Sequence, residues 1–130
     1  MKTLYLKTVK GKGRGVFCKQ KIKKDEIFEI CPLLVIPSED YVSVIETQLV
    51  DYFFNFNKEE NSKAIALGFG SMYNHAKFSN AAYILKPESK TIEFYALEDI
   101  KSCNEITINY GGERGKDYSI WFESRNMTMK

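Results

Sequence analysis

Residues 67–83, LGFGSMYNHAKFSNAAY, hold the only histidine of the 130-residue chain, His75, in a small and polar segment with an asparagine on either side. A second stretch, residues 104–112, reads NEITINYGG and alternates apolar and polar residues up to Tyr110. Alternation with a period of two predicts a strand, and the paired glycines predict its end. Polar turns at strand ends carry sites more often than the strands between them. We therefore expect these two stretches to form one site.

Length and composition predict one domain with a core of ordinary size. The chain has nine phenylalanines and eight tyrosines, so we expect aromatic side chains to dominate the core and any pocket. The net charge is only +2, because 17 acidic residues offset 19 basic ones. This balance predicts no direct nucleic-acid interface. No apolar run has the length of a signal peptide or a bilayer span, so we predict no membrane partner.

The three cysteines, Cys18, Cys31 and Cys103, are odd in number and far apart. They match neither a disulfide framework nor a paired-cysteine zinc site, and we predict no metal. Free thiols indicate a reducing, intracellular compartment. This would be the cytoplasm, or a host nucleus if the protein is viral or a secreted effector.

The rest of the chain predicts a mainly β fold with one short helix. Strands are expected over residues 4–9, 16–18, 27–30, 33–36, 64–67, 81–85, 91–96 and 106–109. Pro32 predicts a break or an edge between the third and fourth of these. Ser38 as N-cap, with Glu39 and Asp40 behind it, predicts a helix that ends near residue 46. Residues 49–56, LVDYFFNF, are aromatic and β-prone.

Glycines alternate with cations in residues 11–15, GKGRG. Glycine permits positive φ and lets a ligand approach the backbone closely. Taken alone, the motif predicts a glycine-rich hairpin, since it lacks the spacing of a dinucleotide or phosphate-binding loop.

The order of these motifs resembles that of the SET-domain protein lysine methyltransferases. The resemblance runs from about residue 5 to residue 111 and is carried by GKGRGVF, DYFF, ALGFGSMYNHAKFSN and ALEDIKSCNEITINYGG. It is closest to small stand-alone members from viruses and bacteria. It implies a mainly β, β-clip-like SET-domain fold of short sheets with a threaded C-terminal segment. The SET domain would span residues 1–112, and residues 113–130 would be a lid or tail of the same domain.

The resemblance also implies a cofactor, S-adenosylmethionine, and a set of site residues. The backbone of Lys12, Gly13, Arg14 and Gly15 would border the methionine end of the cofactor. Tyr73, Asn74 and His75 would hold the adenine end, and Trp121 would stack over the cofactor as a lid. Tyr110 would stand at the transfer site, and Tyr52 is the second catalytic candidate, in the lysine channel.

Elementary chemistry agrees with these roles. Methyl transfer needs a neutral amine, whereas free lysine has a pKa of about 10.4. An aromatic channel lowers the pKa by desolvating the ammonium, and aromatic faces stabilise nearby cations. A phenol such as Tyr110 can orient the amine without adding a full charge. We expect the substrate to be a lysine in a basic, histone-like peptide, and we also expect homodimer formation.

Departures from the family pattern keep alternatives open. Ala76 replaces the usual serine, Ser79 replaces a cysteine or proline, and Cys103-Asn104-Glu105 replaces Gly-Glu-Glu. The chief alternative is a catalytically silent SET-like module that binds a peptide or partner. Retention of Asn74, His75 and Tyr110 favours the enzyme. Core packing is as good a role for Tyr52 as catalysis, whereas for Trp121 the resemblance favours stacking over core packing. A cysteine hydrolase is disfavoured, because no cysteine lies in a nucleophile motif.

Overall fold

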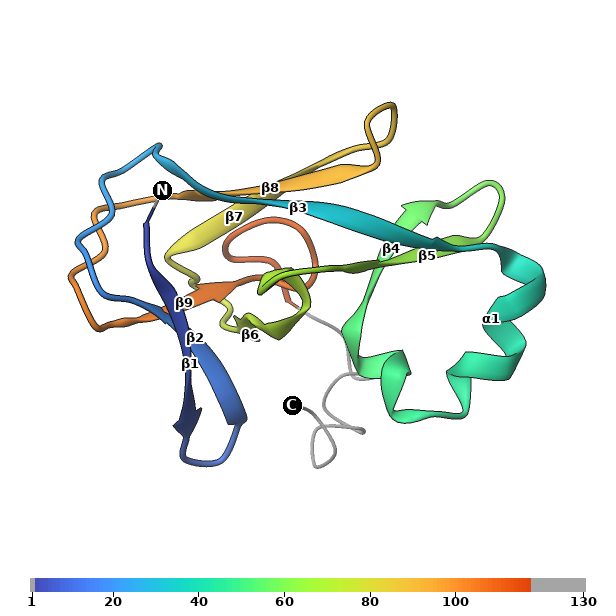
Figure 1. Cartoon of the computed structure of the whole chain (residues 1–130), viewed down its shortest axis with the longest axis horizontal. Coiled ribbons are helices and arrows are strands. Elements are labelled where there is room, and N and C mark those ends of the chain that lie inside the picture. Colours follow the sequence, from blue (N-terminus) through green and yellow to red (C-terminus); the bar gives the residue numbers. More distant parts are fainter. Residues whose placement is uncertain (1, 118–130) are drawn as a thin grey trace.

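The computed structural model describes residues 2–117, which form a mainly β fold with one short α-helix (Figure 1). The elements are β1 (Leu4–Val9), β2 (Gly13–Cys18), β3 (Ile27–Ile36), α1 (Ser38–Ile45), η1 (Gln48–Tyr52), β4 (Phe53–Asn57), β5 (Ser62–Ala66), η2 (Gly70–Met72), β6 (Asn74–His75), β7 (Ala81–Lys86), β8 (Thr91–Ala96) and β9 (Glu105–Ile108). The η elements are 3₁₀ turns. The predicted fold class is confirmed, and within the described range no helix has the length and apolar character needed to cross a bilayer.

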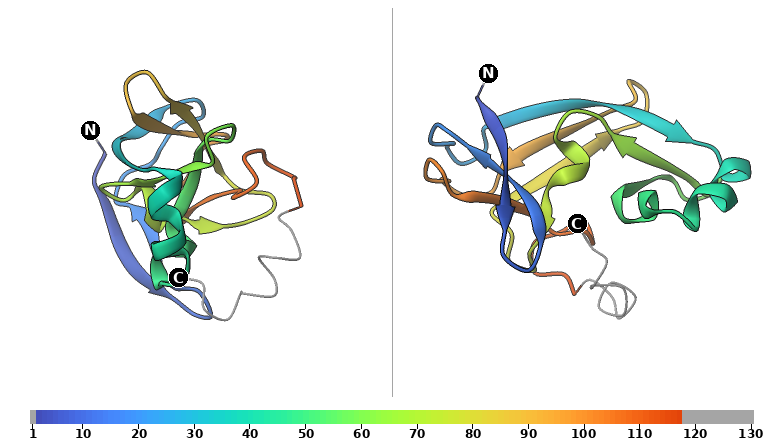
Figure 2. Two further views of the ribbon diagram at one scale, coloured as in Figure 1. Left: turned by 90° about the vertical axis from the view of Figure 1, so that its right-hand side faces the viewer. Right: turned by 60° about the horizontal axis from the view of Figure 1, so that its bottom comes forward.

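The strands form two sheets, and the views in Figures 1 and 2 show the four-stranded sheet beside one end of the longer one. The order is β1-β2-β9-β6 in the smaller sheet and β4-β5-β3-β8-β7 in the larger. β6 and β9 pair in parallel, with Asn74 opposite Thr107 and His75 opposite Ile108. The two stretches that the sequence singles out therefore lie side by side.

Of the two outcomes predicted at Pro32, a break or an edge, the break is wrong, because β3 runs without interruption through this residue. β3 changes partner at this residue: it pairs with β8 up to Pro32 and with β5 from Leu33 onward. The carbonyl of Pro32 accepts the Leu67 N–H at 3.0 Å, just beyond the end of the β5 pairing. The missing N–H of proline thus falls where the ladder ends, so it costs no strand hydrogen bond.

The helix lies where it is expected, but Ser38 is not its N-cap. Ser38 is the first helical residue, Pro37 occupies the cap position, and no side chain caps the helix. Glu39 and Asp40 do lie in the first turn, where the helix dipole favours negative charge. Tyr52 ends the turn η1 instead of lying in a strand, and β4 begins one residue later.

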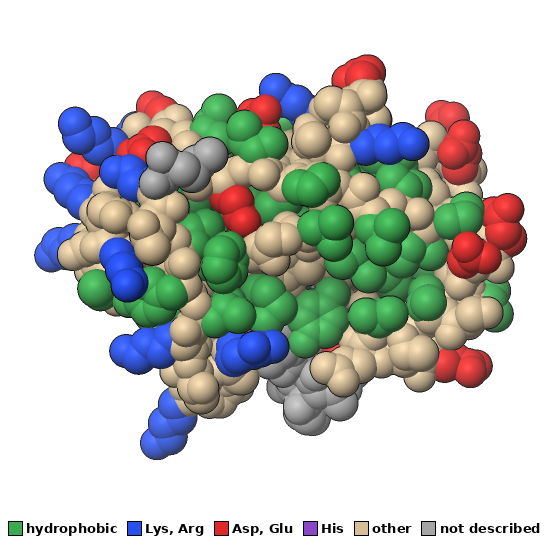
Figure 3. Space-filling model, viewed as in Figure 1, with side chains coloured by type: hydrophobic (Ala, Val, Ile, Leu, Met, Phe, Trp, Pro, Cys, Tyr) green, Lys and Arg blue, Asp and Glu red, His purple; other side chains and the backbone are tan. Residues whose placement is uncertain are grey.

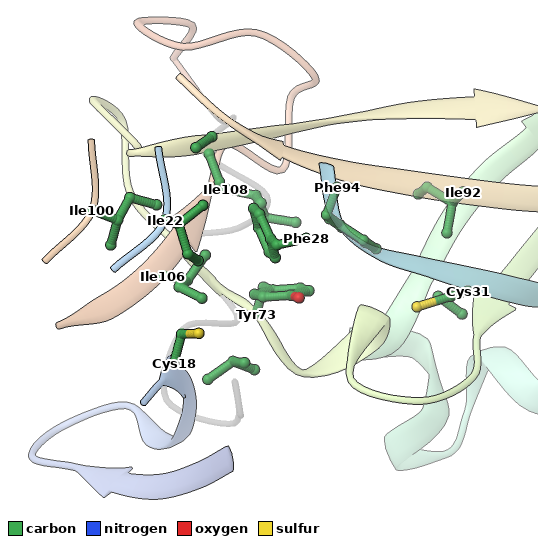
Figure 4. Packing of buried hydrophobic residues seen from close by; sticks show 14 of the residues in the cluster. Cys18, Ile22, Phe28, Cys31, Tyr73, Ile92, Phe94, Ile100, Ile106 and Ile108 are labelled. Atoms are coloured by element: carbon green, nitrogen blue, oxygen red, sulfur yellow. The ribbon is translucent and has the colours of Figure 1, made fainter. Parts of the chain in front are cut away.

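The core is aromatic, as composition predicts. Phe28, Tyr73 and Phe94 are fully buried, and Figure 4 shows Tyr73 in the middle of the cluster with Phe28 above it. The ring centroids of Tyr73 and Phe94 are 4.6 Å apart. Such pairs contribute about 0.5–1.5 kcal/mol beyond the burial of their area. The core therefore fixes the residue that directly precedes Asn74.

The segment after β9 packs against the loop that follows β6. Asn109 is buried, and its Nδ2 donates to the carbonyls of Lys77 at 3.2 Å and Lys116 at 2.7 Å. Its Oδ1 accepts the Gly111 N–H at 2.8 Å. One asparagine therefore holds the turn after Tyr110 and the returning chain, and this crossing is the threaded segment that the resemblance implies.

Cys103 lies in the left-handed region, at φ +64°, where the family pattern has a glycine. A side chain in that region destabilises the folded state by about 1–2 kcal/mol. Glycine avoids this strain, but its greater backbone freedom in the unfolded state offsets about 0.5–1 kcal/mol of the gain. We expect Cys103→Gly to raise the free energy of unfolding by about 0.5–1 kcal/mol, measured by urea denaturation. Asn104→Gly serves as the control, because Asn104 does not have a positive φ, and this substitution should lower the free energy of unfolding. A lower free energy of unfolding in Cys103→Gly would contradict the backbone strain at Cys103.

Candidate active site

Tyr110 is held at both ends by the segment that contains β6. Its N–H donates to Nδ1 of His75 at 3.0 Å, and its hydroxyl donates to the carbonyl of Tyr73 at 2.8 Å. The centroids of the His75 and Tyr110 rings are 5.1 Å apart. The position of the phenol therefore depends on the backbone of residues 73–75.

The Tyr110 N–H also assigns the tautomer of His75. Because Nδ1 accepts this hydrogen bond, the proton of the neutral imidazole lies on Nε2. His75 thus anchors the Tyr110 backbone and is not placed as a general base.

Asn74 joins the glycine-rich turn to β9. Its side chain is buried, and Nδ2 donates to the Arg14 carbonyl at 3.2 Å and to Oε2 of Glu105 at 2.7 Å. A Cβ on Gly15 would lie 2.4 Å from Oε2 of Glu105 and 2.9 Å from Nδ2 of Asn74. The sequence suggested that these glycines admit a ligand. For Gly15 the structure gives an internal reason instead, since it admits two side chains of the protein.

Two backbone edges beside this junction suit the expected cofactor. β2 pairs with β1 along its whole length but with β9 only at Val16 and Phe17. Over Gly13–Gly15, the edge facing away from β1 pairs with no strand of the described range. β6 is the outermost strand of its sheet, so one of its edges is also unpaired by strands. Together these edges offer main-chain donors and acceptors, with Lys12 and Arg14 exposed next to them.

The Tyr73 side chain lies in the core. It is fully buried, and its hydroxyl donates to Oε1 of Glu29 at 2.7 Å. Burial, followed by the charge of Glu29, raises its pKa well above the ordinary value, so the phenol stays protonated. The expected contact of Tyr73 with a cofactor is thus limited to its main chain.

A cavity of about 600 Å³ opens next to Tyr110. Its aromatic lining is Tyr41, Tyr52, Phe53, Phe54, Tyr73, Tyr83 and Tyr110. Both predicted catalytic tyrosines therefore border one space. Within the described range, the lining includes none of Lys12–Gly15, Asn74 or His75. The aromatic cavity and the backbone edges at β2 and β6 are separate parts of the site.

The turn that contains η2 also fixes the second tyrosine. Ser71 Oγ donates to the carbonyl of Tyr52 at 2.9 Å and accepts the N–H of Ala66 at 2.9 Å. Tyr52 thus belongs to the cavity wall and is anchored through its main chain. This placement agrees with the lysine channel that the resemblance implies and leaves its catalytic role a prediction.

Sequence reasoning missed Tyr83 and Glu29. Tyr83 lines the cavity, and its ring meets that of Phe54 edge-on at 5.1 Å. The alternation in residues 81–85 carried this signal, because it puts Tyr83 on the face of the buried Ala81. The signal for Glu29 was a single carboxylate inside an apolar strand. Trp121, the expected lid, lies outside the described residues.

The departures from the family pattern leave the site connected. The N–H of Ala76 donates to the Ile108 carbonyl at 3.0 Å, so its backbone extends the β6–β9 pairing without a hydroxyl. Ser79 is fully buried, and its Oγ donates to the Ala81 carbonyl at 3.0 Å. Glu105 retains the carboxylate that binds Asn74.

The chain is similar to known proteins of one family. The model of the SET domain matches residues 13–111. A Schizosaccharomyces pombe histone-lysine N-methyltransferase, specific for H3 lysine 37, is 32% identical over 121 residues, or 92% of this chain and 77% of that enzyme. A candidate histone methyltransferase from Plasmodium falciparum is 33% identical, with a TM-score of 0.68 over 85% of this chain and 99% of its own.

A further solved structure shows the fold alone. Polycomb Repressive Complex 2 from Chaetomium thermophilum, in an autoinhibited conformation bound to S-adenosylmethionine, is 22% identical with a TM-score of 0.72. The match covers 96% of this chain and 17% of that one.

The chain belongs to the SET-domain family, whose model matches most of its length. The identity to a histone-lysine N-methyltransferase supports its assignment as a protein-lysine N-methyltransferase. Enzymes of this family use S-adenosylmethionine as methyl donor. The closeness to small stand-alone viral and bacterial members stays a prediction.

The buried acids next to Tyr73 predict a loss of stability at alkaline pH. Burial, followed by the charge of Glu29, raises the pKa of Cys31 from 9.0 to about 12. Above pH 9 the unfolded chain loses this proton and the folded chain keeps it. The stabilisation is thus complete below pH 9 and is lost as the pH rises toward 12, by about 1.4 kcal/mol per unit. Between pH 8 and 10, urea denaturation should show that the free energy of unfolding declines less steeply for Cys31→Ala than for the parent. An equal decline in both proteins would contradict the raised pKa of Cys31.

Proposed function

We propose that this protein transfers a methyl group from S-adenosylmethionine to the ε-amine of a lysine in a basic, histone-like peptide. The observation that carries the proposal is the phenol of Tyr110, fixed by Tyr73 and His75 at the wall of an aromatic cavity. The match to a histone-lysine N-methyltransferase supports the same reaction.

The backbone edges at β2 and β6 would hold the cofactor. The main chain of Lys12–Gly15 would border its methionine end, and that of Tyr73–His75 its adenine end. Asn74 serves the site indirectly, since its amide holds the two edges together through Arg14 and Glu105. When bound, the cofactor supplies an electrophilic methyl group on a sulfonium.

The cavity would receive the lysine as a neutral amine. Loss of water around the amine disfavours the ammonium there, so the proton is released to water before transfer. The Tyr110 hydroxyl donates its own proton to the Tyr73 carbonyl, which leaves the phenol oxygen in the role of acceptor toward the amine. An N–H of the amine bonded to that oxygen would aim the nitrogen lone pair at the methyl group. The protein thus contributes alignment and exclusion of water.

The charge of the chain segment beside the cavity supports a basic substrate. Residues 38–57, which include α1, η1 and β4, carry four acidic residues and no basic one. Figure 3 shows acidic side chains gathered at this end of the molecule. Of these acidic residues only Asp51 lines the cavity itself, and Lys58, Lys63 and Lys116 line it too. A cationic peptide would therefore meet a favourable field outside the cavity, along residues 38–57.

The alternative is a silent module that binds a peptide without transferring a methyl group. Such a module would have the same cavity as the enzyme and would differ from it only in the absence of turnover. Homodimer formation also stays a prediction, for which the exposed Ile30, Leu34 and Ile84 on the larger sheet are the relevant apolar residues. Trp121 remains the predicted lid of the cofactor.

We expect transfer of radiolabelled methyl from S-adenosylmethionine to histone-tail peptides, and a loss of about 100-fold or more in Tyr110→Phe. The variant loses only the hydroxyl that points at the Tyr73 carbonyl, so its circular dichroism should be unchanged. Mass spectrometry of the peptide would locate the methylated lysine.

Tyr95→Phe is the matched control, because Tyr95 lies on the opposite face of β8 from the buried Phe94. It should retain full activity. A fully active Tyr110→Phe would remove the assigned role of the phenol. A parent protein that binds the peptide and S-adenosylmethionine but transfers nothing would establish the silent module.

A further inference from the structure

Glu29 is a carboxylate on an otherwise apolar strand, and both of its oxygens bind the turn that leads to β6. Oε2 accepts the N–H of Phe69 at 2.9 Å, and Oε1 accepts the hydroxyl of Tyr73 at 2.7 Å. The two donors lie at the start and the end of residues 69–73. One side chain therefore fixes the span of this turn.

The turn has little freedom to adjust. A Cβ on Gly70 would lie 2.5 Å from the Cβ of Ala66 and 3.0 Å from Sγ of Cys31. Gly68 has a φ of +70°, and a Cβ there would lie 2.9 Å from Oε2 of Glu29. The turn is thus packed directly against Glu29 and Cys31, which lie on the same strand. A change of the Glu29 side chain therefore requires the backbone of the turn to shift.

The far end of the turn is the acceptor of the Tyr110 hydroxyl. Tyr73 donates its hydroxyl to Glu29 and offers its carbonyl to Tyr110 at 2.8 Å. Its ring is fully buried between Phe28 and Phe94 and transmits the position of the hydroxyl to the backbone. Continuous contacts lead from the Glu29 carboxylate through Tyr73 to the phenol of Tyr110.

We propose that Glu29 is a positioning residue for the methyl-transfer site, which sets the place of the Tyr110 oxygen through Tyr73. The inference rests on the proposed function and deepens it. It assigns no contact between Glu29 and substrate. The competing account is that Glu29 only satisfies buried donors, in which case its replacement lowers stability and leaves Tyr110 where it is.

Two variants test whether Glu29 sets the position of Tyr110 through Tyr73. Tyr73→Phe removes the hydroxyl and leaves Oε1 of Glu29 without that donor. Glu29→Gln keeps the size of the side chain and one acceptor for the Phe69 N–H. Its amide group then faces Tyr73 as a donor and reverses the hydrogen bond. Glu29→Gln therefore keeps the proposal testable if Tyr73→Phe does not fold.

The first readout needs no substrate. In protein labelled with ¹³C at the ζ carbon of tyrosine, the signal of Tyr110 is identified by its absence from Tyr110→Phe. We expect this signal to move in both variants and to stay in place in Glu93→Gln, a matched control on the outer face of β8 that is paired with Lys86. An unmoved Tyr110 signal in folded Glu29→Gln would overturn the proposal.

The second readout is steady-state methyl transfer. We expect kcat to fall about tenfold or more in Glu29→Gln, with KM for the peptide and Kd for S-adenosylhomocysteine within twofold of the parent. An unchanged kcat, or a rise in KM and Kd that accounts for the whole loss, would also overturn it. A parent without any transfer would contradict the proposed function, whereas the tyrosine signal would still decide whether Glu29 positions Tyr110.

Discussion

The site depends on the short parallel pairing of β6 with β9. It involves only Asn74 and His75 on one side and Thr107 and Ile108 on the other, yet it joins residues more than thirty positions apart. A ladder of this length is weak by itself, since stable sheets need several strands and a buried face. Buried Tyr73 before it and buried Asn109 after it supply the missing stability. The core therefore stabilises the ladder and, through it, the position of the Tyr110 phenol.

Satisfied asparagine amides extend this pairing at both ends. Asn80 donates to the Glu105 carbonyl at 2.8 Å and accepts the Thr107 N–H at 2.9 Å, as a strand backbone would. Asn74 and Asn109 bridge three chain segments each through one amide. Buried amides of this kind are costly unless every partner is present, so they specify one arrangement of the segments. This explains how the three amides of Asn74, Asn80 and Asn109 can fix the arrangement of the site without apolar contacts of their own.

The sequence alone predicted the elements that rest on local pattern. Alternation located β1, the β7–β8 hairpin and β9, and the order of motifs brought Tyr110 beside His75. The sequence could not decide between a break and an edge at Pro32, because the exchange of β8 for β5 as partner of β3 is a tertiary event. The core position of Tyr73 and the bridging role of Glu29 depend on a hydrogen bond between residues 44 positions apart. A lone carboxylate in an apolar strand marks Glu29 as unusual but does not specify this partner. Aromatic residues such as Tyr52 stay ambiguous in sequence, since core and cavity walls use the same side chains.

The proposed site has two parts: backbone edges for the cofactor and an aromatic cavity for the lysine, joined at Tyr110. The most direct test is calorimetric titration of a histone-tail lysine peptide into the protein, first alone and then saturated with S-adenosylhomocysteine. Separate subsites predict one peptide bound per chain in both experiments, with equal or higher affinity in the saturated protein. Competition between the two ligands, seen as loss of peptide binding at saturation, would contradict this division.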